Sequence, residues 1–274
     1  MAGIWTNRSN PTSIRTMRKE IMRSGVWGNK PSEGSFCTIT ITNSPLLEEY
    51  TNSVTVLGDN DGELWRALDF CLSTMNVGEK SLFSLDLNGS TISLVIELTK
   101  LDFKGFIFQW SASEKYALSV HHKEKGNCFF KSNNTKEAAF RYSKALKIIC
   151  SIPIDVEQTP NEVDGVPISN ISSLKSILYN NLASCYLRVE NWGRVYDLSN
   201  KVLEYDSCNI KALYKMGVAC EKERDFEKAY KILRNVSQMD PGNKACNEHL
   251  SIIKEEIRNE NIKVNIMTKR MFSK

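Results

Sequence analysis

The sequence predicts two domains of different class: an α+β N-terminal domain with an antiparallel sheet and one helix, then an all-α solenoid of paired helices. β-prone runs separated by turn signals fill the chain up to about residue 104, and helical periodicity dominates after about residue 110. Small residues also recur at the spacing of a helical repeat in the second half. We therefore divide the chain into a flexible N-terminus (1–12), the α+β domain (13–104), a linker (105–118), the repeats (119–241) and a capping helix with a basic tail (242–274).

The composition is that of an ordinary globular protein and excludes several classes of function. Charged residues make up 25% of the 274 residues, apolar residues 41%, and the net charge is +4. A nucleic-acid-binding protein would show a concentrated basic face, so we expect no nucleic-acid partner. The sequence has no apolar run of membrane-spanning length and no signal-like N-terminal segment, so we expect no membrane partner. The expected location is the cytoplasm, with the nucleus as an additional location.

The cysteines and histidines predict neither a metal site nor a disulfide framework. None of the eight cysteines forms a CxxC pair, and only three histidines are present to complete a zinc site. The chain also has no glycine-rich phosphate loop. We therefore expect no cofactor, and thiols that are reduced and mostly buried. The neighbours His121 and His122 are expected on a helix surface.

Short alternating runs in the first domain predict strands around a single helix. A tight hairpin signal, Asn88-Gly89-Ser90, joins the last two runs. The one helical stretch places its leucines, Cys71 and Met75 near a common face. The expected strands cover residues 36–42, 53–57, 81–87 and 91–101, and the expected helix covers 63–75.

The second half contains three self-similar units with the period of the tetratricopeptide repeat (TPR). Ala183 and Gly217 occupy equivalent positions and lie one such period apart, whereas Gly126 precedes Ala183 by considerably more than one period. Roughly 23 extra residues therefore lie between the first two units. They coincide with residues 153–173, which contain three prolines and are expected to form an extended loop.

The ends of this repeat array carry signals of their own. Ser111, followed three residues later by Glu114, predicts a capping box that opens the first helix. Residues 242–258 are expected to form the capping helix that closes the stack. Residues 261–274 are basic with interspersed apolar side chains. This composition fits a segment that binds acidic partners or calmodulin, and the alternative is a frayed continuation of the capping helix.

The segments KEKGN (123–127) and FK (130–131) resemble the opening of the TPR domains in FKBP-type immunophilin co-chaperones. The resemblance implies a pocket in which five side chains hold the C-terminal EEVD peptide of a heat-shock chaperone. Carried over one at a time, those positions fall on Lys123, Asn127, Asn181, Lys211 and Lys215.

Helical spacing supports such a carboxylate clamp without the family. Lys123 and Asn127 are four residues apart and share a helix face, as do Lys211 and Lys215. Cations and amide donors gathered on one surface can hold a terminal carboxylate. Lysine at 215 replaces the usual arginine and loses its bidentate fork, which predicts weaker or less specific binding. The alternative is that each lysine is a solvated surface residue and that Asn181 serves packing.

Residues 14–104 resemble an FKBP domain. The resemblance rests on the entry segment IRTMRKEIMRSG, on MNVGEKSLFSL at 75–85 and on the closing VIELTKLDF. It implies a prolyl-isomerase fold, but the pocket residues are not matched: the floor tryptophan falls on Leu68, and the loop with the family's tyrosine is reduced to the turn at 88–90. We therefore expect no isomerase activity. The alternatives are a residual isomerase and an unrelated α+β domain.

The sequence as a whole predicts a non-catalytic FKBP-like TPR co-chaperone that binds an EEVD-tailed heat-shock chaperone and a client protein. Two alternatives stay open. One is an active or residual peptidyl-prolyl isomerase. The other is a scaffold whose groove takes internal client segments and does not bind chaperone tails.

Overall fold

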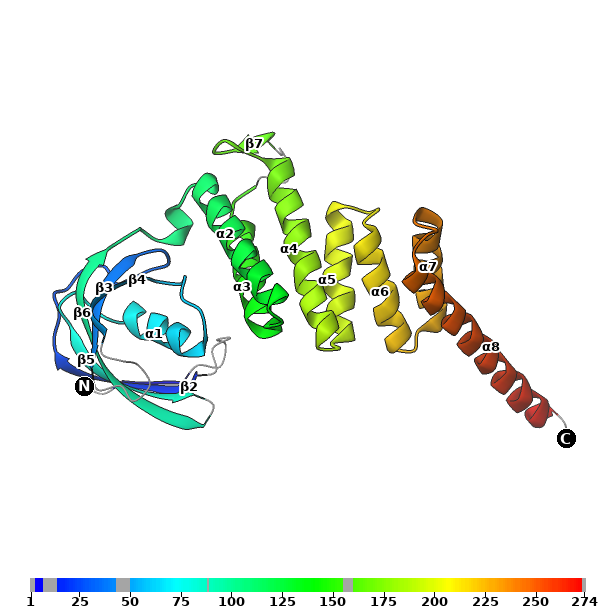
Figure 1. The fold of residues 1–274 in the computed structure, drawn as a ribbon, viewed down its shortest axis with the longest axis horizontal. Helices are drawn as coiled ribbons and strands as arrows, with labels where there is room; N and C mark the ends of the chain where they lie inside the picture. Colours follow the sequence, from blue (N-terminus) through cyan, green and yellow to red (C-terminus); the bar gives the residue numbers. More distant parts are fainter. Residues whose placement is uncertain (1–2, 7–13, 43–49, 88, 155–159, 273–274) are drawn as a thin grey trace. The chain divides into compact units, whose positions relative to one another are not determined.

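The chain forms two compact units, Met1–Trp110 and Ser111–Lys274, in a computed structural model (Figure 1). The structure describes residues 3–6, 14–42, 50–87, 89–154 and 160–272. The first unit contains a sheet and one long helix, and the second consists almost entirely of helices. The predicted fold class, an α+β domain followed by an all-α repeat domain, is confirmed.

The first unit is a six-stranded antiparallel sheet in the order β1-β2-β5-β6-β3-β4, and Figure 1 shows it curving around helix α1. One expectation is wrong: residues 3–6, placed in a flexible N-terminus, form a strand because they pair with β2, Gly3 opposite Lys19. The rest of 1–12 lies outside the described residues. The elements are β1 (Gly3–Thr6), β2 (Ile14–Arg23), β3 (Phe36–Thr42), β4 (Tyr50–Val56), α1 (Glu63–Ser73), β5 (Lys80–Leu87) and β6 (Ser90–Asp102).

The alternating pattern of β3 explains why the sheet has one buried face. Cys37, Ile39 and Ile41 are each at most 1% exposed, while the threonines between them are half-buried on the other face. β5 and β6 pair from Lys80 opposite Glu97 to Leu87 opposite Ser90, as the hairpin signal predicts.

Helix α1 fills the concave side of the sheet. Leu68, Cys71 and Leu72 are buried on it, as the expected apolar face predicts. They pack in one cluster with the inward side chains of the strands, including Phe83 and Ile96, both fully buried. Burial of this apolar surface is the main source of the unit's stability.

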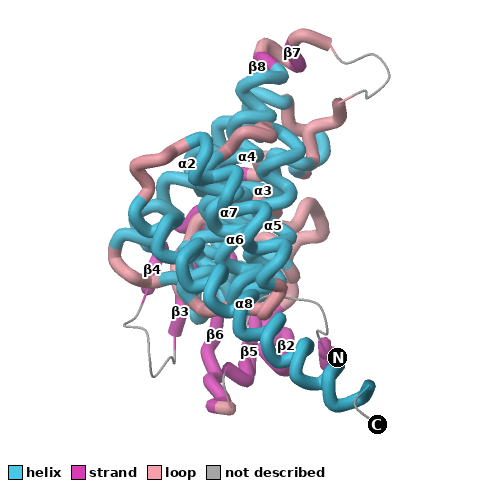
Figure 2. Tube along the Cα trace, turned by 90° about the vertical axis from the view of Figure 1, so that its right-hand side faces the viewer, coloured by secondary structure: helices cyan, strands magenta, loops and turns pink. Residues whose placement is uncertain are grey.

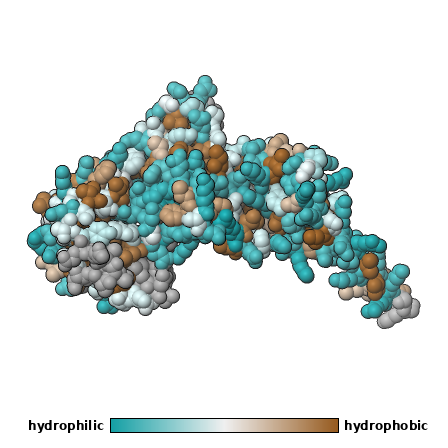
Figure 3. All heavy atoms as spheres, viewed as in Figure 1, coloured by the Kyte–Doolittle hydropathy of each residue, from teal (hydrophilic) through white to brown (hydrophobic). Residues whose placement is uncertain are grey.

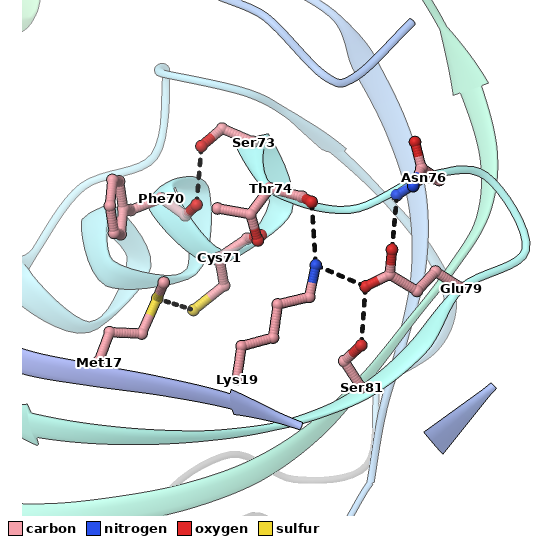
Figure 4. A network of polar contacts seen from close by, with 9 residues as sticks. All are labelled: Met17, Lys19, Phe70, Cys71, Ser73, Thr74, Asn76, Glu79 and Ser81. Carbon is pink, nitrogen blue, oxygen red and sulfur yellow. Dashed lines mark hydrogen bonds and ion pairs between the residues drawn. The ribbon is translucent and has the colours of Figure 1, made fainter. Parts of the chain in front are cut away.

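A buried ion pair joins β2 to the segment between α1 and β5 (Figure 4). Lys19 Nζ lies 2.6 Å from Glu79 Oε1 and donates to the Thr74 carbonyl at 2.9 Å. The second Glu79 oxygen accepts from the Asn76 N–H at 3.0 Å, and Ser81 Oγ donates to Glu79 Oε1 at 2.7 Å. Burial alone would raise the pKa of Glu79, but the bonds from Lys19, Asn76 and Ser81 hold that pKa below its ordinary value.

The second unit stacks helices in consecutive antiparallel pairs (Figures 1 and 2). A short 3₁₀ turn, η1 (Ile107–Gln109), precedes it. The predicted capping box is confirmed, because the Ser111 side chain accepts from the Glu114 N–H and the Glu114 carboxylate accepts from the Ser111 N–H. The helices are α2 (Ala112–Lys131), α3 (Thr135–Cys150), α4 (Ile168–Arg188), α5 (Trp192–Tyr205), α6 (Ile210–Lys222), α7 (Phe226–Met239) and α8 (Lys244–Phe272).

The small residues that define the repeat lie where paired helices approach most closely. A Cβ added at Gly126 would lie 2.6 Å from the ring of Tyr142, and one added at Gly217 would lie 2.6 Å from Leu233. Both partners follow their glycine at the same separation in the sequence. Ala183, at the equivalent position of the second repeat, is fully buried. The contacts between α2 and α3 and between α6 and α7 are therefore built alike.

The turns inside the repeats also recur. One residue with positive φ lies between the two helices of each repeat: Asn133, Glu190 and Arg224. The sequence spacings between these three residues equal those between the small residues Gly126, Ala183 and Gly217. The residue after each, Asn134, Asn191 or Asp225, caps the next helix by accepting a backbone N–H. The repeat in the sequence therefore corresponds to a repeat both in the helix-helix contacts and in the turns between paired helices.

The segment expected as an extended loop, 153–173, contains a hairpin and the start of a helix, so the expectation is wrong for its second half. β7 (Glu162–Val163) and β8 (Val166–Pro167) form a hairpin around Asp164 and Gly165, both with positive φ. Helix α4 begins at Ile168, and Figure 2 shows the hairpin at its N-terminal end. The Asp164 carboxylate accepts from the Ala112 N–H at 2.7 Å, which ties the hairpin to α2. Residues 155–159 lie outside the described residues.

Helix α8 is longer than the expected capping helix. It runs without a break from Lys244 to Phe272, so most of the basic tail continues the helix. Only its first half is buried, through Cys246, Leu250 and Ile253. Among the helices that the structure describes, none combines the length and the apolar character needed to cross a bilayer.

Breaking the buried ion pair is predicted to destabilise the first unit strongly. Glu79→Gln leaves Lys19 with an uncompensated buried charge and should lower the free energy of unfolding by about 3 kcal/mol, measured by urea denaturation at pH 7.

The stabilisation by Glu79 should also depend on pH, because its folded-state pKa lies below its unfolded-state pKa. The contribution of Glu79 to the free energy of unfolding is therefore fully present above the unfolded-state pKa and is lost as the pH falls through the folded-state pKa.

The matched control is Glu97→Gln, which breaks the Arg23–Glu97 pair on the same sheet. The Arg23 side chain is 58% exposed, so this loss should be no more than about 1 kcal/mol. Equal losses in the two variants would contradict the assignment of Lys19–Glu79 as the stabilising pair.

Candidate functional site

The first helices of the second and third repeats line a pocket of about 310 Å³. Asn180 and Asn181 contribute to it from α4, and Lys211, Tyr214 and Lys215 from α6. Lys211 and Lys215 lie one helical turn apart, so their ammonium groups enter the pocket from one side. The pocket combines two cations with amide donors and one aromatic ring.

Lys215 is held by the helix opposite. Its Nζ donates to the backbone carbonyl of Asn180 at 2.8 Å and to the side-chain oxygen of Asn180 at 2.6 Å. Burial and, to a smaller extent, the nearby charge of Lys211 lower the pKa of Lys215 to about 8. Lys215 is therefore still a cation at pH 7, and a nearby negative charge would offset both the cost of its desolvation and the repulsion from Lys211.

The asparagine pair extends the site from α4 to α2. Asn127 Oδ1 accepts from the Tyr142 hydroxyl at 2.7 Å and from Asn181 Nδ2 at 3.3 Å. Because both bonds go to its carbonyl oxygen, the orientation of the Asn127 amide is fixed and its Nδ2 is the atom that can donate to a ligand. Burial is also the main cause that raises the pKa of Tyr142 to about 12, so its hydroxyl stays protonated as a donor.

Four of the five predicted clamp residues thus form a linked set. Asn127 is bonded to Asn181, and Asn181 shares the pocket with Lys211 and Lys215. Lys123 is placed by its helix: it lies half-buried on α2, four residues before Asn127 and on the same face. Lys211 is exposed, whereas the two asparagines and Lys215 are half-buried.

Sequence reasoning missed Asn180 and misread His122. Asn180 directly precedes Asn181 and lies about one TPR period before Lys215, which is the signal that could have found it. His122 was expected on the helix surface, but it is fully buried, and its Nδ1 lies 3.1 Å from Nη1 of the fully buried Arg141. Helix α2 is covered on that face by α3, which a single-helix pattern does not reveal.

In the first unit, Leu68, the residue at the expected pocket floor, belongs to the apolar core. Leu68 is 1% exposed and packs in the apolar cluster between α1 and the sheet. Trp65, one turn earlier, is half-buried and packs edge-on against Tyr50 with ring centroids 5.4 Å apart. The β5–β6 connection is a tight turn, since Leu87 pairs with Ser90.

Comparisons with known proteins agree with this two-unit architecture. No protein-family model matches the chain. The "FK506-binding protein-like" protein of Mus musculus is 28% identical over 265 residues, covering 93% of this chain and 70% of the relative. "Peptidyl-prolyl cis-trans isomerase FKBP4" of Mus musculus is 28% identical over 153 residues, covering 56% of this chain but 32% of that protein.

A solved structure supports the repeat assignment in the second unit. The C-terminal TPR-containing domain of a Plasmodium falciparum FK506-binding protein superimposes with a TM-score of 0.51 at 28% identity. The match covers 57% of this chain and 98% of that domain. The curved sheet around one helix, the three helix pairs and these similarities agree with the layout of FKBP-like proteins that carry a TPR domain.

Proposed function

We propose that this protein is a non-catalytic co-chaperone adaptor whose TPR unit binds the C-terminal EEVD tail of a heat-shock chaperone. The observation that carries the proposal is the linked row of donors from α2, α4 and α6. Asn127 and Asn181 supply amide groups, and Lys211 and Lys215 supply two ammonium groups at one end of that row. Lys123 extends it on α2.

The electrostatics of the pocket favour a free carboxylate over a neutral peptide segment. After burial, the charge of Lys211 is the second cause that lowers the pKa of Lys215, because the two cations repel each other. A carboxylate between them replaces that repulsion with two attractive contacts, in a setting partly screened from water. A chain terminus and an adjacent acidic side chain supply such groups, whereas an internal segment supplies only its side chains.

The first unit is assigned a binding or stabilising role. A buried leucine occupies the position that the FKBP resemblance gives to the pocket floor, and a tight turn replaces the long loop. A proline ring needs a walled apolar cavity to be desolvated. The relative that bears the name of an isomerase keeps catalysis as the alternative function.

The client is inferred from a resemblance to one protein. The sequence resembles the insect protein Bride of Doubletime, which implies a casein-kinase-type kinase as client and a part in circadian timing. The adaptor would then bring a chaperone and this kinase together, in the cytoplasm or the nucleus. A chaperone-independent TPR scaffold remains the other alternative.

Tail binding is predicted to depend on the free carboxylate. A pentapeptide ending in EEVD should bind the full chain at least about tenfold more tightly than its C-terminal amide, because amidation removes a charge-assisted contact worth about 1.5–3 kcal/mol. Lys211→Ala should cause a similar loss, whereas Lys222→Ala, which removes an exposed lysine on the same helix, should not. Isothermal titration calorimetry measures both. Equal binding of peptide and amide, with Lys211→Ala without effect, would favour the scaffold alternative.

The same binding is predicted to weaken at alkaline pH. Since the pKa of Lys215 is about 8, the side chain loses its charge as the pH rises from 7 to 9, and the Kd for the free-carboxylate peptide should rise by up to about tenfold. Lys215→Arg keeps its charge over this range and should flatten the profile. A pH profile that is identical in wild type and Lys215→Arg would show that Lys215 does not contact the tail.

The full chain is predicted to show no isomerase turnover. A protease-coupled assay with a proline-containing peptide should give the uncatalysed rate, because Leu68 fills the expected pocket floor. Leu68→Trp, which restores the family's side chain, tests whether that residue alone is limiting. Clear turnover by the wild-type chain would establish the isomerase alternative.

A further inference from the structure

One apolar stripe of α8 packs onto the helical stack. Cys246, Leu250 and Ile253 are buried there, and Ile257 is partly buried against the same cluster, which includes Leu233 of α7. Their spacings alternate between four and three residues. This is the spacing that keeps a stripe facing a second helix over several turns.

The stripe continues along α8 after the stack ends. With the same alternating spacing, the next positions are Glu260, Val264, Met267 and Met271. Val264 is 58% exposed, Met267 65% and Met271 76%. Figure 3 shows apolar side chains on the surface of this end of the helix. A surface that is buried along the first half of α8 is therefore open along the second half, which marks an interaction site.

We propose that this surface pairs, in antiparallel orientation, with the same surface of a second copy of the chain. Ile257 then lies opposite Met267 of the second copy, and Glu260 lies opposite Val264, with the symmetry axis at residue 262. Met271 reaches the edge of the second copy's stack. The continuity of the stripe with the α7–α8 contact is what defines the face that pairs.

The charges of α8 select the antiparallel orientation. Glu255 and Glu256 lie in the first half of the pairing region, and Lys269 and Arg270 lie at its end. Antiparallel pairing places Glu256 beside Arg270 of the second copy, twice by symmetry. Parallel pairing would instead place Glu256 beside Asn261 and Lys263 beside Thr268, so these charges would gain no partner of opposite sign. At the centre, Lys263 of each copy lies one turn from Glu260 of its own helix, which offsets the repulsion between the two lysines.

A second copy fits these features better than an anionic lipid surface does. A lipid-binding helix carries mainly Lys and Arg on its polar face. Here Glu255, Glu256 and Glu260 are interspersed with the basic residues, and they would be repelled by anionic headgroups. The pairing surface lies on α8 alone, so the proposal does not depend on the chaperone-tail groove.

Sedimentation equilibrium of the full chain at about 10–200 µM tests the proposal. Wild type should show a concentration-dependent dimer. Met267→Glu, on the stripe, should raise the dimer Kd at least tenfold, whereas Ile266→Glu should leave it unchanged. Ile266 is a matched control because it is 47% exposed and adjacent in sequence but points away from the stripe.

Charge exchange tests the orientation. Glu256→Arg and Arg270→Glu should each raise the dimer Kd about fivefold, as expected for losing two exposed ion pairs, and the double variant should restore it. A wild type that stays monomeric at the highest concentration would overturn the proposal, as would equal effects of Met267→Glu and Ile266→Glu or a double variant without rescue. Binding of monomers to vesicles containing phosphatidylserine would also overturn it, in favour of a lipid surface.

Discussion

The close approach of paired helices is the constraint on which the candidate groove depends. Gly126 and Gly217 admit Tyr142 and Leu233 at distances where any side chain at the glycine would clash. Tight pairing within each repeat positions α2, α4 and α6 so that Asn127, on α2, bonds to Asn181, on α4. Asn127, Asn181 and Lys215 are therefore held in place by packing and hydrogen bonds, which lowers the cost of ordering these three side chains on binding.

The same packing explains the unusual state of Lys215. Its ammonium is held between α6 and α4 by both oxygens of Asn180, where burial and Lys211 lower its pKa. Arginine at this position would stay charged at any physiological pH, whereas lysine makes the groove sensitive to mildly alkaline conditions. The substitution thus changes the pH range of the site as well as its geometry.

Much of the fold could be predicted from the sequence because its signals are local. The spacing of Ala183 and Gly217, the Ser111–Glu114 capping box and the alternation in residues 36–42 each report on a single element or a single repeat. The clamp positions followed from a resemblance and from four-residue spacing, and the structure links four of the five.

The features that sequence reasoning missed depend on contacts between distant segments. Residues 3–6 form a strand only because β2 is beside them, and His122 is buried only because α3 covers it. Asn180 gains its role from Lys215, which belongs to the following repeat. The hairpin around Asp164 did carry a local Asp-Gly signal, which the neighbouring prolines masked.

The central claim is that side chains from α2, α4 and α6 bind one carboxylate tail together. The most direct measurement is an NMR titration of the full chain with the EEVD peptide, following the side-chain amides of Asn127 and Asn181 and the Cε resonance of Lys215. We predict that all three signals shift with a single dissociation constant. Saturation of binding with these three signals unmoved, and shifts confined to other surfaces, would contradict it.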